Sequence, residues 1–325
     1  MLQQVIQWFW ALLRRTAGVC LDLFKVMVPA LIAVKILEVA GIFGPIADAI
    51  APVMELAGLP GEAGLAWVTG MLSNMYGGLT ITAGMIQPLQ LNTAQVTTLG
   101  CMLLISHSLP VEITIAARAG VKPWFLIPFR LLTGLLFGII LGQIFKATGT
   151  LQGTPTVVWS AAEQGAGLVE WVVGIMRSMA TIFFVILGVL GIMDLLDKLG
   201  IMALLKRIFR PAFSPMGIGD EASTITVIGL VLGISYGGGM IIRQASRGHI
   251  PPRQILASVS FMSICHAVIE DTFLVASLGV WAVAALPGRI LYSWLIMFLL
   301  LLVSRRLSDR RIMQLCKPPE ISESV

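Results

Sequence analysis

Two histidines, each followed by carboxylates within an apolar run, are the residues of this chain best suited to chemistry. Glu112 follows His107 by five residues, and Glu270 and Asp271 follow His266. An ionisable residue inside a membrane costs about 2.5–3.5 kcal/mol on insertion scales and is a functional candidate by default. Because histidine titrates near neutral pH and ligates metals, these residues could carry a proton or hold a metal ion. The alternative is that each histidine only forms a hydrogen bond to a neighbouring helix.

Two arginines and two cysteines accompany these groups. Arg130 and Arg289 could pair with Glu112 and Asp271 or bind an anionic substrate, and a purely structural ion pair is the alternative. The four cysteines of the chain have no C-x-x-C spacing, so neither a disulfide framework nor a zinc site is indicated by the cysteines alone. The candidate metal ligands are His107, His266, Cys101 and Cys265.

The composition indicates that these residues lie in a membrane protein. Of 325 residues, 57% are hydrophobic and 12% are charged, and the mean hydropathy is +0.91. Soluble domains are about 45–50% apolar and about 25% charged. This excludes a soluble enzyme, a nucleic-acid-binding domain and a disordered regulator, and it makes the lipid bilayer the main partner. We predict neither an enzymatic activity nor a cofactor.

An internal repeat with an offset of 159 residues organises the chain. The matched positions are mostly Gly, Pro and the rare polar residues, which a biased apolar composition would not align by chance. They include the pairs His107–His266, Glu112–Asp271, Arg130–Arg289, Gly58–Gly217 and Gly120–Gly279. Tyr76-Gly77-Gly78 and Tyr236-Gly237-Gly238 match at an offset of 160. The predicted organisation is an interfacial N-terminal segment (1–19), repeat 1 (20–145), an external connecting loop (146–173), repeat 2 (174–304) and a cytoplasmic tail (305–325).

Each repeat contains five predicted elements. The first, fourth and fifth are long enough to span a membrane, which takes about 20 residues. The second is interfacial, the third is Gly-rich and broken at Tyr-Gly-Gly, and each histidine falls at the middle of a helix in the fourth. The ranges are 24–44, 46–57, 62–87, 93–118 and 123–145 in repeat 1, and 174–193, 197–213, 221–245, 253–279 and 286–304 in repeat 2.

The distribution of basic residues indicates that the repeats are inverted. The loop before the fourth element is uncharged in repeat 1 (87–95) but contains Arg243, Arg247 and Arg253 in repeat 2. The loop after it shows the reverse bias, with Arg118 and Lys122 in repeat 1 and no charge in repeat 2. Since cytoplasmic loops carry an excess of Lys and Arg, equivalent loops lie on opposite sides of the membrane and both termini are inside.

The third element is predicted to be a re-entrant hairpin of two half-length helices. Inversion requires an odd number of crossings per repeat, and three crossings plus a hairpin satisfy it. Five full crossings are the alternative, and Tyr-Gly-Gly could instead mark close helix packing. The hairpin tips offer polar side chains to a solute: Asn74, Tyr76, Ser235 and Tyr236.

This pattern resembles the nucleoside recognition, or Gate, domain family of bacterial membrane proteins. The residues that carry the resemblance are Asn74-Met-Tyr-Gly-Gly78 with His107, and Ser235-Tyr-Gly-Gly-Gly239 with Cys265-His266. Two Gate repeats cover nearly the whole chain. Spore maturation proteins A and B resemble single repeats, and similar domains occur in concentrative nucleoside transporters and in the ferrous iron transporter. The GTPase loop of that iron transporter is absent here.

The functional expectation is a secondary transporter of a small polar solute, nucleoside-like or not, coupled to an ion. Its site is expected at the repeat interface near the midplane, formed by His107, Glu112, His266, Glu270, Asp271 and the hairpin tips. The alternatives are a divalent metal permease and a non-transport protein of membrane assembly or signalling. We expect a multi-pass protein of the inner (plasma) membrane that binds no nucleic acid, with Gly-rich helix faces that allow a homodimer.

Overall fold

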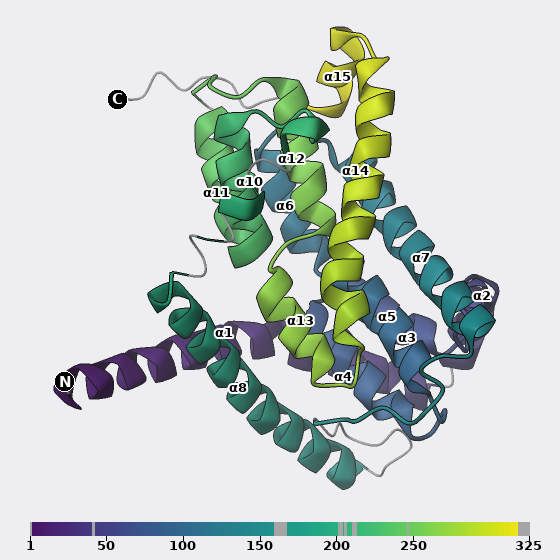
Figure 1. Ribbon diagram of the computed structural model, residues 1–325. Helices are drawn as coiled ribbons and strands as arrows, with labels where there is room; N and C mark the ends of the chain where they lie inside the picture. Colours follow the sequence, from purple (N-terminus) through teal and green to yellow (C-terminus); the bar gives the residue numbers. More distant parts are fainter. Residues whose placement is uncertain are drawn as a thin grey trace.

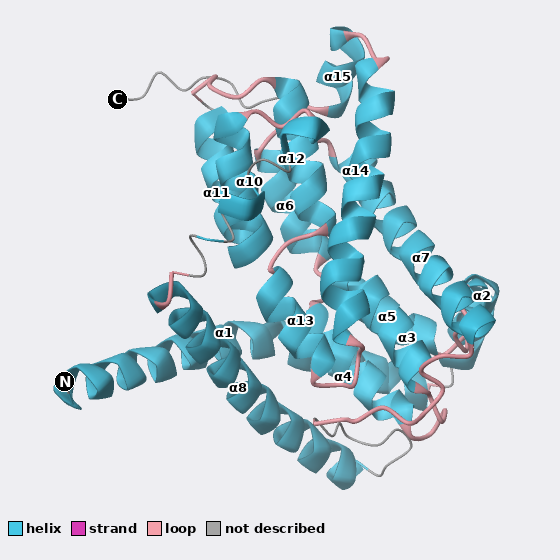
Figure 2. Cartoon of the chain, viewed as in Figure 1, coloured by secondary structure: helices cyan, strands magenta, loops and turns pink. Residues whose placement is uncertain are grey.

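The computed structural model describes residues 2–40, 43–158, 168–200, 204, 207–209, 213–245 and 247–317, and the regular elements in them are helices (Figures 1 and 2). Five segments of the described chain are long and apolar enough to cross a membrane. They are Thr93–Arg118, Pro123–Thr148, Val172–Ile192, Pro252–Ala276 and Ala284–Arg305. The prediction of an all-α polytopic membrane protein is confirmed.

The helices of repeat 1 follow the predicted order. They are α1 (Leu2–Val39), α2 (Phe43–Leu56), α3 (Ala63–Leu72), α4 (Met75–Ile86), α5 (Thr93–Ser106), α6 (Leu109–Arg118) and α7 (Pro123–Thr148). The predicted interfacial segment and the first apolar element are continuous within α1, because no helix-breaking sequence separates them. The α3–α4 pair corresponds to the predicted third element, and neither helix is long enough to span a bilayer alone. A hairpin of two short helices is therefore present in place of two full crossings, but the prediction that it breaks at Tyr-Gly-Gly is wrong. The chain leaves the helix at Ser73 and Asn74 in repeat 1 and at Gly233 in repeat 2, and both Tyr-Gly-Gly triplets lie inside the second helix of their pair.

Repeat 2 has the same order with one addition. It contains α8 (Leu168–Lys198), η1 (Ser214–Met216), α10 (Asp220–Leu232), α11 (Ile234–Ala245), α12 (Pro252–Ile264), α13 (Val268–Ala276), the π-helical turn η2 (Ala284–Gly288) and α14 (Arg289–Arg305). The predicted interfacial element at 197–213 lies largely outside the described residues. The addition is α15 (Asp309–Leu315), a short helix within the segment predicted as a tail.

The two repeats run in opposite directions (Figure 1). The α3–α4 hairpin lies at one end of the molecule and the α10–α11 hairpin lies at the other. The chain passes from α5 to α6 toward the end that carries α15, and from α12 to α13 away from it. The helices α7 and α14 are likewise opposed. The inversion predicted from the basic residues is therefore present in the structure.

The fourth element differs from its prediction in both repeats. The chain leaves the helix at His107 and Ser108, between α5 and α6, and at Cys265 to Ala267, between α12 and α13. The prediction that each histidine lies in the middle of a continuous helix is wrong. Pro110 favours the first break because it cannot donate to the helix, but repeat 2 has no matching proline, and its break depends on tertiary contacts described below.

Close glycine contacts hold the two helices of each hairpin together. A Cβ on Gly78 would lie 2.9 Å from the Cα of Gly70, and a Cβ on Gly237 would lie 2.6 Å from the Cα of Gly229. Both glycine pairs keep the offset of 159 residues. Gly78 is thus equivalent to Gly237, which is one residue out of register with the alignment of the Tyr-Gly-Gly triplets at an offset of 160. Of the two interpretations of Tyr-Gly-Gly, these contacts support close helix packing.

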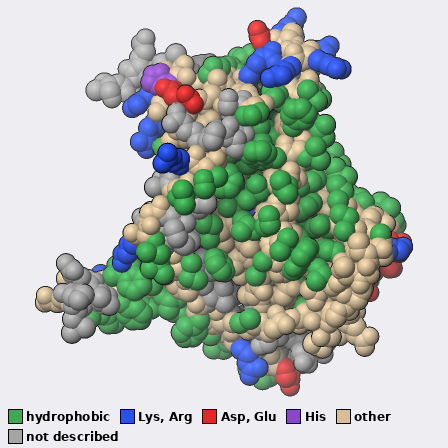
Figure 3. Space-filling model, in the orientation of Figure 1, with side chains coloured by type: hydrophobic (Ala, Val, Ile, Leu, Met, Phe, Trp, Pro, Cys, Tyr) green, Lys and Arg blue, Asp and Glu red, His purple; other side chains and the backbone are tan. Residues whose placement is uncertain are grey.

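The loops gather at two ends in the way that the charge pattern predicts. At one end, a bridge joins Val121 to Cys316, and Arg253 pairs with Asp309 at 2.8 Å. Lys and Arg cluster near α15 at this end, while hydrophobic side chains cover the exposed face of α14 (Figure 3). At the other end, the backbone N–H of Thr93 donates to the carbonyl of Gly153.

The inverted topology predicts opposite labelling of two introduced cysteines. Gln87→Cys, in the uncharged loop after α4, should react with an impermeant maleimide from outside the cell. His249→Cys, in the basic loop after α11, should react only after the membrane is opened. The native cysteines provide little background because all four are buried, and burial raises the pKa of Cys316 to about 12. Labelling of both positions from the same side would contradict the inversion.

Candidate functional site

The two helix breaks have the same backbone geometry. Ser108 and Ala267 stand directly before α6 and α13, and both adopt the left-handed conformation with φ of 52° and 45°. This conformation costs a residue with a Cβ about 1–2 kcal/mol. The breaks therefore persist because the surrounding structure compensates for them, and two contacts do so in each repeat.

The first contact is a buried arginine from the closing helix. The Nε of Arg130 donates to the carbonyl of Ile105 at 3.0 Å, and its second terminal nitrogen donates to the carbonyl of His107 at 2.9 Å. In repeat 2, the Nε of Arg289 donates to the carbonyl of Ile264 at 3.1 Å. Both arginine side chains are fully buried. They satisfy carbonyls at the ends of α5 and α12 that would otherwise have no partner at membrane depth.

The second contact comes from the hairpins. The backbone N–H of Ser108 donates to the carbonyl of Gly70 at 2.9 Å, and that of Ala267 donates to the carbonyl of Gly229 at 3.4 Å. The absence of a side chain at these glycines also lets each hairpin approach the broken helix, since a Cβ on either would overlap Leu103 or Met262. Each hairpin is thus docked on the break of its own repeat.

The breaks turn both histidines toward the repeat interface with a defined tautomer. His107 Nδ1 lies 2.9 Å from the carbonyl of Leu103, and His266 Nδ1 lies 2.7 Å from the carbonyl of Met262. A carbonyl oxygen only accepts, so each Nδ1 must carry a hydrogen. In the neutral imidazole each Nε2 is then a free lone pair. The ring centroids are 5.2 Å apart.

Glu112 is shared by both rings. Its Oε1 lies 3.2 Å from His107 Nε2 and 3.3 Å from His266 Nε2. Its other oxygen, Oε2, lies 2.7 Å from the Nη1 atom of Arg130. Arg130 and Glu112 therefore form a buried ion pair. One carboxylate therefore joins the two repeats at their buried centre.

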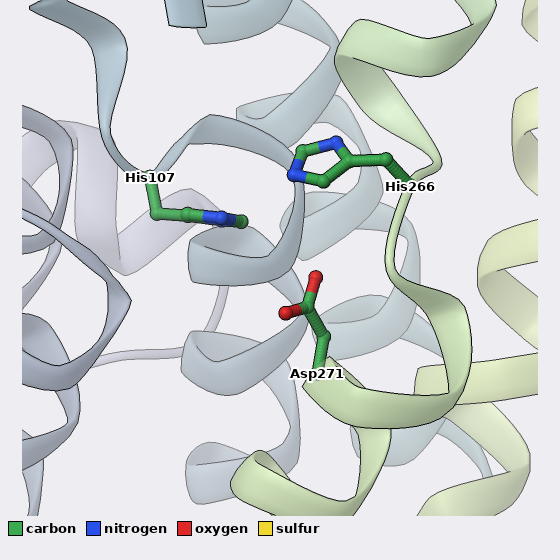
Figure 4. Close-up of side chains that lie close together, drawn as sticks. All are labelled: His107, His266 and Asp271. Carbon is green, nitrogen blue, oxygen red and sulfur yellow. The ribbon is translucent and has the colours of Figure 1, made fainter. Parts of the chain in front are cut away.

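Asp271, the equivalent of Glu112, holds a looser position. It lies 3.5 Å from Arg289, and its ligand atom lies within 4.8 Å of those of both histidines. Figure 4 shows the side chains of His107, His266 and Asp271 pointing into one space. All of these side chains are nearly inaccessible to solvent. We call His107, His266, Glu112 and Asp271 the paired-histidine centre.

The predicted hairpin-tip residues are not part of the paired-histidine centre. Asn74 caps α4, because its side chain accepts from the backbone N–H of Gly77 at 2.9 Å. Tyr76 is buried and lies near enough to Glu270 and Asp271 to interact with them electrostatically. Glu270 is half-buried and lies outside the centre. The side chains of Ser235 and Tyr236 lie outside the described residues.

Of the four predicted metal ligands, the two histidines lie close together, whereas the two cysteines lie elsewhere. Among the described residues, the group with converging ligand atoms is His107, His266 and Asp271. Cys101 and Cys265 are fully buried and are not part of it.

One further motif of the sequence lacks the structural setting of an active site. Gly233-Ile-Ser235-Tyr-Gly237 fits the Gly-x-Ser-x-Gly pattern of serine hydrolases, but it joins two helices, whereas that motif requires a strand-to-helix turn.

Comparison with known proteins agrees with this architecture. The family model Gate (nucleoside recognition) matches residues 20–122 and 178–281, one match in each repeat. The chain belongs to the Gate family. This Gate protein is similar to the membrane protein YvoD of Bacillus subtilis (strain 168), with 28% identity over 263 residues that cover 79% of this chain and 82% of the relative. No solved structure matches.

The arginine contacts predict a large loss of stability on Arg130→Met. This variant leaves Glu112 buried without its cation and the carbonyls of Ile105 and His107 without a donor. Removing one partner of a buried ion pair costs about 3–5 kcal/mol, so we expect a clearly lower unfolding temperature in detergent. Arg118→Met, at an exposed position of α6, is the control and should unfold near the parent temperature. Equal unfolding of the two variants would contradict the role given to Arg130.

Proposed function

We propose that this Gate protein is a membrane transporter of a small polar solute or ion, and that the paired-histidine centre is its cation site. One observation carries the proposal: the Nε2 atoms of both histidines, which are lone pairs when the rings are neutral, lie 3.2 and 3.3 Å from a single carboxylate oxygen of Glu112. Three acceptors at this spacing repel one another until a cation lies among them. A cation site of this kind is a common component of ion-coupled transport.

The location of the centre supports the same proposal. Inverted-repeat transporters bind substrates and coupling ions near the midplane, between repeats and at interrupted helices. Here the ligands come from the breaks α5–α6 and α12–α13, which belong to different repeats. On this proposal the protein lies in the cytoplasmic membrane with both termini inside, and nucleosides are the first solutes to test because of the family's description.

The differences between the repeats suggest how access alternates. The first repeat has the tighter contacts: Ser108 to Gly70 at 2.9 Å and Arg130 to Glu112 at 2.7 Å. The corresponding contacts of repeat 2 are 3.4 Å and 3.5 Å. We propose that the repeats exchange these geometries during transport. Because the hairpins lie at opposite ends, exchange would open the centre to the opposite side of the membrane.

The three histidines of the chain provide a matched transport experiment. Proteoliposomes would be tested for uptake of radiolabelled uridine, adenosine and zinc. His107→Ala and His266→Ala should each abolish uptake because they remove half of the proposed cation site. His249→Ala should transport at the parent rate, since His249 is exposed and bonds only to Gln244 in the described structure.

Folding is checked separately by size-exclusion chromatography and unfolding temperature of each variant. Full uptake by the folded His107→Ala and His266→Ala proteins would overturn the proposed role of the centre.

A further inference from the structure

We infer that the cation of the paired-histidine centre is a divalent first-row transition metal, Zn²⁺ foremost, held by the Nε2 atoms of His107 and His266 and by the carboxylates of Glu112 and Asp271. This deepens the proposed function by naming the ion. The test measures binding, so the inference can fail while cation-dependent transport stands.

The distances favour a metal over a shared proton. A hydrogen bond between imidazolium and carboxylate is about 2.7–2.9 Å long, whereas Glu112 Oε1 lies 3.2 and 3.3 Å from the two Nε2 atoms. Zinc bonds of about 2.0–2.1 Å in a tetrahedron separate neighbouring ligand atoms by about 3.3–3.4 Å. The two distances from Glu112 to the histidines match those between neighbouring ligands around a zinc ion.

The tautomer and the ring orientation of both histidines also suit metal binding. A metal-binding histidine generally donates its other ring nitrogen to a carbonyl or carboxylate, which fixes the tautomer and aims the lone pair. The carbonyls of Leu103 and Met262 receive these bonds. A single ion between the rings would satisfy both Nε2 atoms at once, while a single proton can bridge only one of the two contacts with Glu112.

Asp271 supplies the fourth ligand. One of its carboxylate oxygens lies within 4.8 Å of a ring nitrogen of each histidine. It would have to approach them to reach the spacing of about 3.3–3.4 Å between neighbouring zinc ligands. Its contact with Arg289 is long, at 3.5 Å, and is therefore weak enough to break when Asp271 binds the ion. Imidazole and carboxylate together suit Zn²⁺ and its neighbours in the first row, and they are poor ligands for Cu⁺, which prefers thiolate and thioether sulfur.

The positive charges of Arg130 and Arg289 do not fully neutralise the carboxylates of Glu112 and Asp271. Arg130 and Arg289 each direct N–H groups at the carbonyl ends of α5 or α12, which carry partial negative charge. Part of each positive charge is therefore balanced by a helix end. On Glu112, the arginine binds Oε2 and leaves Oε1 facing the histidines.

The experiment measures metal binding to the full chain in detergent or nanodiscs. Isothermal titration with Zn²⁺ should give one site per chain, and Co²⁺ substituted there should show the intense visible absorption of a four-coordinate ion. His107→Ala, His266→Ala and Glu112→Gln should lose this site and this spectrum. His249→Ala should keep both, which separates the centre from adventitious binding at the surface.

Two outcomes would overturn the inference. One is the absence of stoichiometric Zn²⁺ or Co²⁺ binding by the folded parent protein. The other is equal binding by His249→Ala and His107→Ala, with both proteins eluting as folded species. If uptake in proteoliposomes still required His107 and His266 in the first case, the cation would not be a divalent transition metal, and the proposed transport function would survive.

Discussion

The backbone of a broken helix must find hydrogen-bond partners within the protein, because lipid offers none. This constraint determines most of what surrounds the centre. A fully buried arginine takes the carbonyls released at each break, and a glycine carbonyl of the hairpin takes the amide of the left-handed residue. The glycine pairs that let the hairpin helices approach, and the final helices that carry the arginines, serve the same requirement.

The breaks in turn explain why the centre exists. A histidine in a continuous helix would point to one side of that helix, whereas a histidine at a break lies on an interhelix segment and reaches the facing repeat. The half-helices α6 and α13 then begin beside it and carry Glu112 and Asp271 in their first turns, where the helix N-terminus favours a carboxylate. Inversion brings two such arrangements to one place, so that residues of both repeats form one centre.

Much of this was predictable from the sequence, and the failures have physical reasons. The offset of 159 residues identified the pairs His107–His266 and Arg130–Arg289, and the asymmetry of basic loops predicted the inversion. The break at His266 was not predictable, because Ala267 has no local tendency to leave the helix and is held there by Gly229 and Arg289 from distant segments. The sharing of Glu112 by both histidines is a tertiary contact that no spacing in one chain reveals. Asn74 looked like a ligand and instead caps a helix.

The central claim is that two broken helices of opposed repeats deliver both histidines to one cation. An experimental structure of the zinc-soaked protein, with anomalous scattering recorded at the zinc edge, tests it most directly. We expect one intramembrane peak about 2.0–2.1 Å from the Nε2 atoms of His107 and His266, with the chain leaving the helix at both residues. Continuous helices through the two histidines, or a zinc peak confined to exposed sites such as His249, would contradict it.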